Sequence, residues 1–553
     1  MNNNILKKYL AALAAIGLIL SFIQPGRHAS AQAAEFPQEN VWTRSTPSVV
    51  WCEDPASTTT LEVHIVARSD VARVWLTDLG TSEEGARAEL FDDGTHGDVQ
   101  TGDNVFTLGQ VVPPCNSHFL SSRNGYGNWW GMLRVELTDG THLENNYGMV
   151  VGLVAPEFKN AFQVQDFGNG LSATAYAFFI QDANHEVMDN YPVANVYCGT
   201  QNYNAYRKLY SVLPDAFDFA LVMPGMQIFR PSDLAENVPY DVTVANSIQH
   251  IGMNLFDHTP EFGSAGRLRA SIFHSFGSTA IVDHEMGHAW GVNIGQTLGL
   301  MDVSGGMTNL GHWNSMADIQ GQMGYYYFGD NGIVGHFGYN GDGTWRLIAN
   351  TEVEPYSPLE LYLMGLIPPE DVPPVHILKD PDLTDLNRIT AASYKTVTID
   401  QIMQAEGGAR IPSVTESQKD FTMAFIVTQD VPYNDAAYAF FSLMSYELMS
   451  KQPPLKNSSS APFYWATGGR GTLDTSLPVE VSAPEYLPGD STPTPIPSAT
   501  YLPTEPAATL PVDSTPTSQP SNPGRPPICT SVFGALGLVL VPGIWHFLRK
   551  RRL

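Results

Sequence analysis

The pentapeptide H-E-M-G-H at residues 284–288 constrains this chain more than any other part of its sequence. Histidines four positions apart lie one above the other on the same face of an α-helix, so His284 and His288 can both reach one metal ion. Residues 280–282, which precede the pentapeptide, are apolar. The spacing therefore predicts a buried helix that presents two metal ligands, with Glu285 placed to accept a proton from an attacking water.

This segment resembles the zincin metallopeptidases, which carry H-E-x-x-H on a helix. Gly291 extends the likeness to the metzincin form H-E-x-x-H-x-x-G-x-x-H, but Ile294 stands where that form has a third histidine. The resemblance covers the helix and, loosely, the residues around it. It implies an α+β zincin-like catalytic domain, which we place at residues 156–480. It also implies Zn²⁺ bound by His284 and His288, and peptide-bond hydrolysis with Glu285 as general base.

A catalytic zinc site needs three protein ligands, so one more must come from elsewhere in the chain. His312 is one candidate, because a histidine followed closely by Ser315 and Met316 is similar to a metzincin third ligand and its Met-turn. Glu360 is the second candidate, by resemblance to zincins that take a glutamate from a downstream helix. His336 is a further alternative.

Glu360 also has a structural explanation. Ser357, Pro358 and Glu360 fit the N-cap, N1 and N3 positions of a helix, where a capping box occupies the carboxylate with backbone N–H groups. A glutamine serves the same N3 position, so this interpretation predicts a mild effect of Glu360→Gln. His312 has no comparable structural duty, and we therefore prefer it as the third ligand.

Residues 35–155 predict an all-β, immunoglobulin-like sandwich domain, because segments such as 61–66 alternate apolar and polar residues. The segment 92–107 resembles the DDG…GD…GD-x-x-[FY]-T turn of immunoglobulin-like modules in bacterial surface proteins. Its acidic side chains can ligate Ca²⁺. Asx hydrogen bonds and glycine backbone freedom also explain the turn, and we favour that interpretation. Cys52 and Cys115 can pair in an oxidising compartment.

Both ends of the chain predict export to the cell surface. Residues 1–33 have the basic, apolar and small-residue regions of a secretory signal peptide. Residues 484–528 form a stalk rich in proline, serine and threonine. Residues 531–553 combine an apolar segment with a basic tail, which predicts attachment to the membrane or a sorting signal. That tail resembles the C-terminal sorting tails of bacterial surface proteins.

Composition excludes one large class of partner. The chain has 56 acidic residues against 29 lysines and arginines, a formal net charge of −27, so its surface repels phosphate backbones. Nucleic acid is therefore not an expected partner. Hydrophobic residues make up 43% of the chain, which is enough for real cores and excludes wholesale disorder.

Together these features predict a secreted, surface-attached zinc metallopeptidase that acts on an extracellular protein or peptide. The alternative is a non-catalytic surface adhesion or binding protein with a degenerate zincin fold. Ile294 keeps this alternative open, whereas the intact His284, Glu285 and His288 favour the enzyme.

Overall fold

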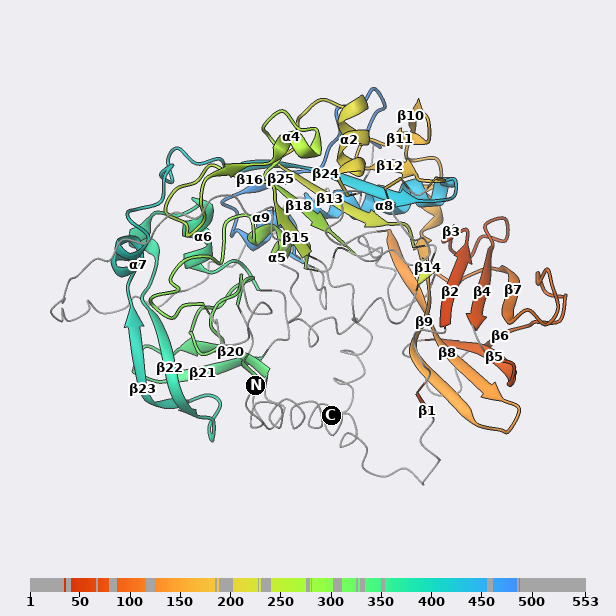
Figure 1. Cartoon of the computed structure of the whole chain (residues 1–553), viewed down its shortest axis with the longest axis horizontal. Helices are drawn as coiled ribbons and strands as arrows, with labels where there is room; N and C mark the ends of the chain where they lie inside the picture. Colours follow the sequence, from red (N-terminus) through yellow and green to blue (C-terminus); the bar gives the residue numbers. More distant parts are fainter. Residues whose placement is uncertain are drawn as a thin grey trace.

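Two facing sheets form the N-terminal part of the protein, and a third, mixed sheet forms the centre of the remainder (Figure 1). The computed structural model describes residues 34–35, 41–65, 68–78, 87–115, 125–184, 186–187, 202–226, 228–229, 240–274, 279, 281–301, 311–324, 327–328, 334–349, 354–454, 461–484 and 487. The predicted signal peptide, most of the predicted stalk and the C-terminal segment lie outside these ranges. Within them, no helix is long and apolar enough to cross a bilayer.

The strands of the N-terminal part turn one face toward a shared apolar core, as the alternation of buried and half-buried positions along β4 shows. One sheet has the order β1 (Ala34–Glu35), β9 (His142–Val154), β8 (Tyr126–Leu137), β5 (Val71–Asp78) and β6 (Arg87–Leu90), with β3 (Val49–Trp51) also paired to β9. The other has the order β14 (Ile228–Phe229), β2 (Val41–Thr46), β4 (Thr59–Ile65) and β7 (Val105–Val111). That these sheets form an immunoglobulin-like domain stays a prediction.

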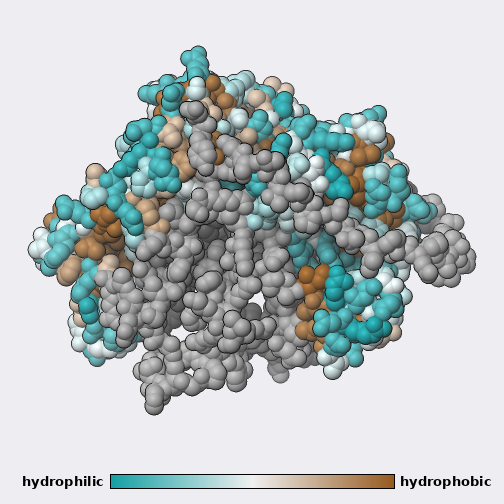
Figure 2. Space-filling view, turned by 180° about the vertical axis from the view of Figure 1, so that it is seen from behind, coloured by the Kyte–Doolittle hydropathy of each residue, from teal (hydrophilic) through white to brown (hydrophobic). Residues whose placement is uncertain are grey.

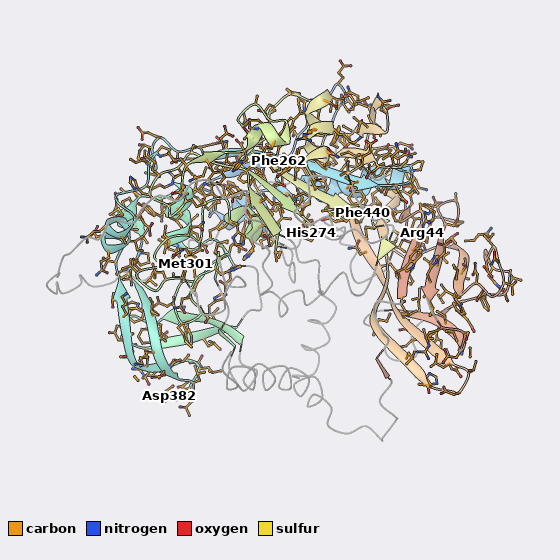
Figure 3. All side chains as sticks on the ribbon, viewed as in Figure 1. Arg44, Phe262, His274, Met301, Asp382 and Phe440 are labelled. Carbon is orange, nitrogen blue, oxygen red and sulfur yellow. A yellow bond between two sulfur atoms is a disulfide. The ribbon has the colours of Figure 1, made fainter. Side chains whose placement is uncertain are left out.

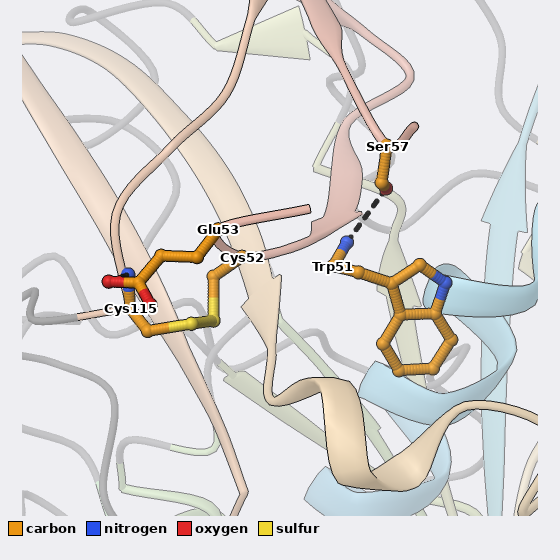
Figure 4. The surroundings of a disulfide bond; sticks show 5 residues. All are labelled: Trp51, Cys52, Glu53, Ser57 and Cys115. Carbon is orange, nitrogen blue, oxygen red and sulfur yellow. Dashed lines mark hydrogen bonds between the residues drawn. A yellow bond between two sulfur atoms is a disulfide. The ribbon is translucent and has the colours of Figure 1, made fainter. Parts of the chain in front are cut away.

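A disulfide links the two N-terminal sheets. Cys52 follows β3 in one sheet, Cys115 follows β7 in the other, and their sulfur atoms are bonded (Figure 4). The pairing suggested by the sequence is therefore confirmed. Cys52 is buried, and its backbone N–H donates to the carbonyl of Val154 on the neighbouring β9.

The mixed sheet has four parallel strands at its centre. Its order is β10 (Gln165–Gly168), β11 (Leu171–Ala173), β12 (Phe178–Gln181), β24 (Asp420–Gln429), β13 (Phe219–Pro224), β18 (Ala270–Phe273) and β15 (Tyr240–Thr243), with β25 (Thr472–Asp474) paired to one end of β24. Strands β12, β24, β13 and β18 are parallel, and β15 is antiparallel to β18.

Helices cover both faces of this sheet, so its central strands direct apolar side chains to both faces. Along β13, Phe219 and Leu221 face one core while Ala220 and Val222 face the other. The helices on the first face are α5 (Val282–Gly287), α6 (Pro358–Met364), α8 (Asp435–Leu448) and α9 (Phe463–Ala466). Those on the second are α2 (Asn202–Val212) and α4 (Thr259–Phe262).

A smaller lobe follows the segment that contains His312. Its elements are the antiparallel sheet of β19 (Tyr327–Phe328), β20 (Val334–Tyr339) and β21 (Trp345–Ala349), and the hairpin of β22 (Val375–Asp382) and β23 (Thr390–Val397). The two parts share a small core around Trp345. The remaining elements are η2 (Pro156–Phe158), η4 (Pro369–Asp371), α7 (Ile399–Ala405), β16 (Ala245–Asn246) and β17 (Phe256–Asp257). On the face shown in Figure 2, hydrophilic residues cover most of the coloured surface.

The N-terminal sheets are joined to the rest of the protein through shared structure. Strand β14, which lies after the predicted boundary at residue 155, pairs with β2, so the second part of the chain completes a sheet of the first. Helix α8 packs on β3 and β9. Phe440 of α8, labelled in Figure 3, lies at this junction. It makes an edge-to-face contact with Tyr126 of β8, and the Asn434 side chain donates to the carbonyl of Val49.

We predict that Gly152→Ala destabilises this junction. A Cβ atom at Gly152 would lie 2.9 Å from Val49 Cγ2 and 3.2 Å from both Met226 and Phe440, so the added methyl group overfills the interface. The expected cost is about 1–3 kcal/mol, measured by thermal unfolding. The same substitution in a Val49→Ala background should cost clearly less, because the nearest atom has been removed. An equal cost in both backgrounds would contradict this explanation.

Candidate metal centre

Helix α5 lies against β18 and β15 at one edge of the mixed sheet. Val282 and Met286 are buried in the core beneath it. A Cβ atom at Gly287 would lie 2.5 Å from Met323 Sδ, so only glycine allows the segment around Met323 to pack this closely. The helix is short, and its burial fixes which side chains face the neighbouring loop.

Three histidines meet beside α5. His284 and His288 project from the helix and its C-terminal cap, and His312 comes from the loop at 311–324; one ligand atom of each lies within 4.8 Å of the others. The Nε2 atoms of His284 and His312 are 3.1 Å apart. Two nitrogens that bind one tetrahedral zinc lie about 3.3 Å apart, as follows from zinc–nitrogen distances of about 2.0–2.1 Å. The donor set and its spacing thus fit a zinc ion.

Backbone carbonyls orient two of these imidazoles. His284 Nδ1 is hydrogen-bonded to the carbonyl of Gln322, which leaves Nε2 directed at His312. His288 is hydrogen-bonded to the backbone of Gly291, and its Nε2 atom is buried without a hydrogen-bond partner among the described residues. Burial lowers the pKa of His284 and, more strongly, that of His288. The neutral imidazole, which is the form that binds metals, is therefore favoured.

Gly311 allows His312 to approach. Its φ is +90°, a left-handed conformation that glycine adopts at no steric cost. A Cβ atom there would also lie 3.0 Å from His288 Cε1 and 3.1 Å from His288 Nδ1. The backbone before His312 therefore packs directly against the His288 ring.

Glu360, the other candidate for third ligand, does not belong to the histidine cluster. The predicted capping box with Ser357 is confirmed. The carboxylate accepts further hydrogen bonds from the loop: Oε1 from Trp313 Nε1 (3.0 Å) and Met323 N (2.7 Å), and Oε2 from Gln322 N (3.2 Å) in addition to Ser357 N (2.6 Å). Glu360 thus holds the loop that carries His312.

Two further carboxylates anchor the same loop, and both residues are half-buried. Asp318 accepts from Trp345 Nε1 (2.9 Å) and from the backbone N–H (2.6 Å) and ring Nδ1 (2.7 Å) of His376. Glu354 accepts from Gly321 N at 3.1 Å. His336, the remaining alternative ligand, lies 3.7 Å from Glu354 Oε2 through its Nε2 and is not part of the histidine cluster.

Glu285 is buried next to Asp241 of the edge strand β15. Its Oε2 atom has no hydrogen-bond partner among the described residues. Burial raises the pKa of Glu285 well above its ordinary value, and the charge of Asp241 raises it further, whereas the Asp241 backbone N–H lowers it. An oxygen of Glu285 also lies within 4.8 Å of the ligand nitrogen of His288. The carboxylate is therefore close enough to exchange a proton with a group held at the histidines.

Several residues of this site carried no recognisable signal in the sequence, namely Asp241, Gly311, Gln322 and Met323. The methionine beneath α5 is Met323, whereas Met316, which the metzincin resemblance suggested, packs against the small core around Trp345.

The acidic turn of the N-terminal part brings Asp92, Asp98 and Asp103 together. Their carboxylates accept backbone N–H groups of the same turn: Asp92 from Gly102 at 2.6 Å, and Asp98 from Gly94 at 2.7 Å. Asp98 and Asp103 also accept from the N–H two positions on, that of Gln100 at 3.2 Å and that of Val105 at 3.0 Å. These two are the Asx hydrogen bonds of the interpretation that we favoured, and Ca²⁺ binding here stays a prediction.

Comparisons with known proteins return no matching family, no matching curated protein and no matching solved structure.

The structure changes the prediction for Glu360→Gln. Both carboxylate oxygens accept two N–H groups each, and a glutamine would turn its own NH₂ toward two of these donors. We expect a loss of about 1–3 kcal/mol in the free energy of unfolding, together with weaker metal binding because the loop loosens. Chemical denaturation and metal titration measure the two effects. A variant with wild-type stability would show that the carboxylate is not the anchor.

Stability should fall as the pH rises through the range in which Glu354 ionises. Burial raises the pKa of Glu354 to about 7. Unfolded glutamate titrates near pH 4.3, so between about pH 4.5 and 7 the folded state holds the extra proton, and the free energy of unfolding decreases with pH.

The Glu354→Gln variant cannot lose that proton. Relative to this variant, the wild type should lose up to about 3 kcal/mol across the range, measured by denaturation at pH 5 to 8. Exposed Glu370→Gln is the control. Parallel curves for wild type and Glu354→Gln would contradict the assignment.

Proposed function

We propose that this protein is an exported zinc metallopeptidase, in which His284, His288 and His312 bind the metal and Glu285 is the general base. The proposal is supported by three imidazoles, of which His288 and His312 are buried and His284 is half-buried. They meet beside the buried carboxylate of Glu285, which has one oxygen without a partner among the described residues. Three protein nitrogens leave a fourth position for a water or a substrate, which is the arrangement of catalytic rather than structural zinc sites.

The protein residues have separate tasks in this proposal. A bound zinc ion polarises the scissile carbonyl and the attacking water. Glu285 takes the proton of that water and passes it to the leaving amine. The carbonyl of Gln322 fixes the ring of His284, and Glu360 fixes the peptide of Gln322. The substrate class is an extracellular protein or peptide, which follows from the predicted export.

The alternative of a non-catalytic adhesion protein rested on Ile294. That residue is 0% exposed and belongs to the core, so it has a packing role of its own. With His312 beside His284, an isoleucine at 294 is no sign of a degenerate site.

Substitution of the base tests the proposal. Glu285→Gln keeps the shape of the side chain but cannot accept a proton, so hydrolysis of a peptide substrate should fall by about 10²-fold or more with zinc still bound. Activity is measured on denatured protein substrates, and zinc is measured by elemental analysis of the full chain. His312→Ala is the companion variant and should bind zinc much more weakly than the wild type. Wild-type activity in Glu285→Gln, or no zinc in the wild type, would refute the proposal.

A further inference from the structure

A second group of possible ligands adjoins the three histidines. Asp241 of β15, Glu285 and His288 each place one ligand atom within 4.8 Å of the others. All three are deeply buried, with exposed fractions of 3%, 2% and 6%. His288 is common to both groups, whereas Asp241 belongs only to this one.

Among the described residues, no lysine or arginine is paired with the two carboxyl groups of this cluster. The groups that shift the pKa of Asp241 and of Glu285 include no lysine or arginine. Asp241 accepts a hydrogen bond from Thr243 Oγ1 at 3.1 Å, and Glu285 Oε2 has no partner among the described residues. Two carboxylates buried side by side repel each other unless a proton or a cation lies between them.

We propose that Asp241, Glu285 and His288 form a second divalent-cation position, weaker than the three-histidine position and alternative to it. Two carboxylates and one imidazole are a suitable ligand set for Zn²⁺ or Mn²⁺. Because both positions use His288, one ion occupies one or the other.

The second position is inactive. An ion held there takes Glu285 as a ligand, and a carboxylate bound to a cation cannot accept the proton of a water. This consequence, unlike the binding itself, rests on the proposed function. Asp241 lies on the edge strand β15, yet its carboxyl group is buried beside the proposed base. A cation held between the two carboxyl groups explains this burial.

The test removes one ligand of the three-histidine position and measures whether the second position still binds a cation. Apo forms of the full chain, made by chelation, are titrated calorimetrically with Zn²⁺ and with Mn²⁺. His312→Ala should bind one ion per chain more weakly than the wild type, and His312→Ala/Asp241→Asn should bind at least about tenfold more weakly again. His312→Ala/Asp474→Asn, which changes an exposed carboxylate on β25, is the matched control and should bind like His312→Ala.

The outcomes separate this inference from the proposed function. If the wild type binds zinc but His312→Ala binds none, or if Asp241→Asn adds no loss to His312→Ala, the two carboxyl groups share a proton and the second position is refuted. If the wild type itself binds no zinc, the proposed metallopeptidase is refuted. Thermal unfolding of each variant shows that loss of binding is not loss of fold.

Discussion

The candidate metal centre depends on one buried carboxylate that binds no metal in our proposal. Glu360 accepts hydrogen bonds from the N–H groups of Trp313, Gln322, Met323 and Ser357. Burial of a carboxylate is costly, and charge-assisted hydrogen bonds to both oxygens offset that cost. These bonds hold the loop at 311–324 against α6. The loop supplies His312 as well as the carbonyl that orients His284, so two of the three imidazoles are placed through Glu360.

The mixed sheet determines the position of α5, which carries the proposed base Glu285 and packs beside the loop at 311–324. Parallel strands β24, β13 and β18 need cover on both faces, and α5 provides part of that cover beside β18. The antiparallel strand β15 then closes the sheet next to α5 and brings Asp241 to Glu285. Before it reaches β15 the chain forms β14 and pairs with β2 of the N-terminal sheets. The N-terminal part is thus built into the same framework as the candidate site.

The sequence could predict those contacts that join residues only a few positions apart in the chain. His284 and His288 on one helix and the capping box of Ser357 and Glu360 are i, i+4 and i, i+3 relationships, and both are present. The other partners of Glu360 come from 37 to 47 positions away, so its role as an anchor was not visible. The two-residue strand β14 was equally hidden, because so short a segment has no periodicity and its partner lies far away in the sequence.

Ile294 explains why the third imidazole comes from a distant loop. The chain turns into the core after α5, and Ile294 is buried there; a Cβ at Gly252 would lie 2.7 Å from its backbone nitrogen. A histidine at this position would place a polar ring in an apolar core. His312 lies 28 positions after His284, and hydrogen bonds to the carboxylates of Glu360, Glu354 and Asp318 hold the loop that carries it. These contacts are all within the protein and do not require an ion. In the proposed site, metal affinity would therefore draw on preorganised ligands and would not have to supply the energy of folding them.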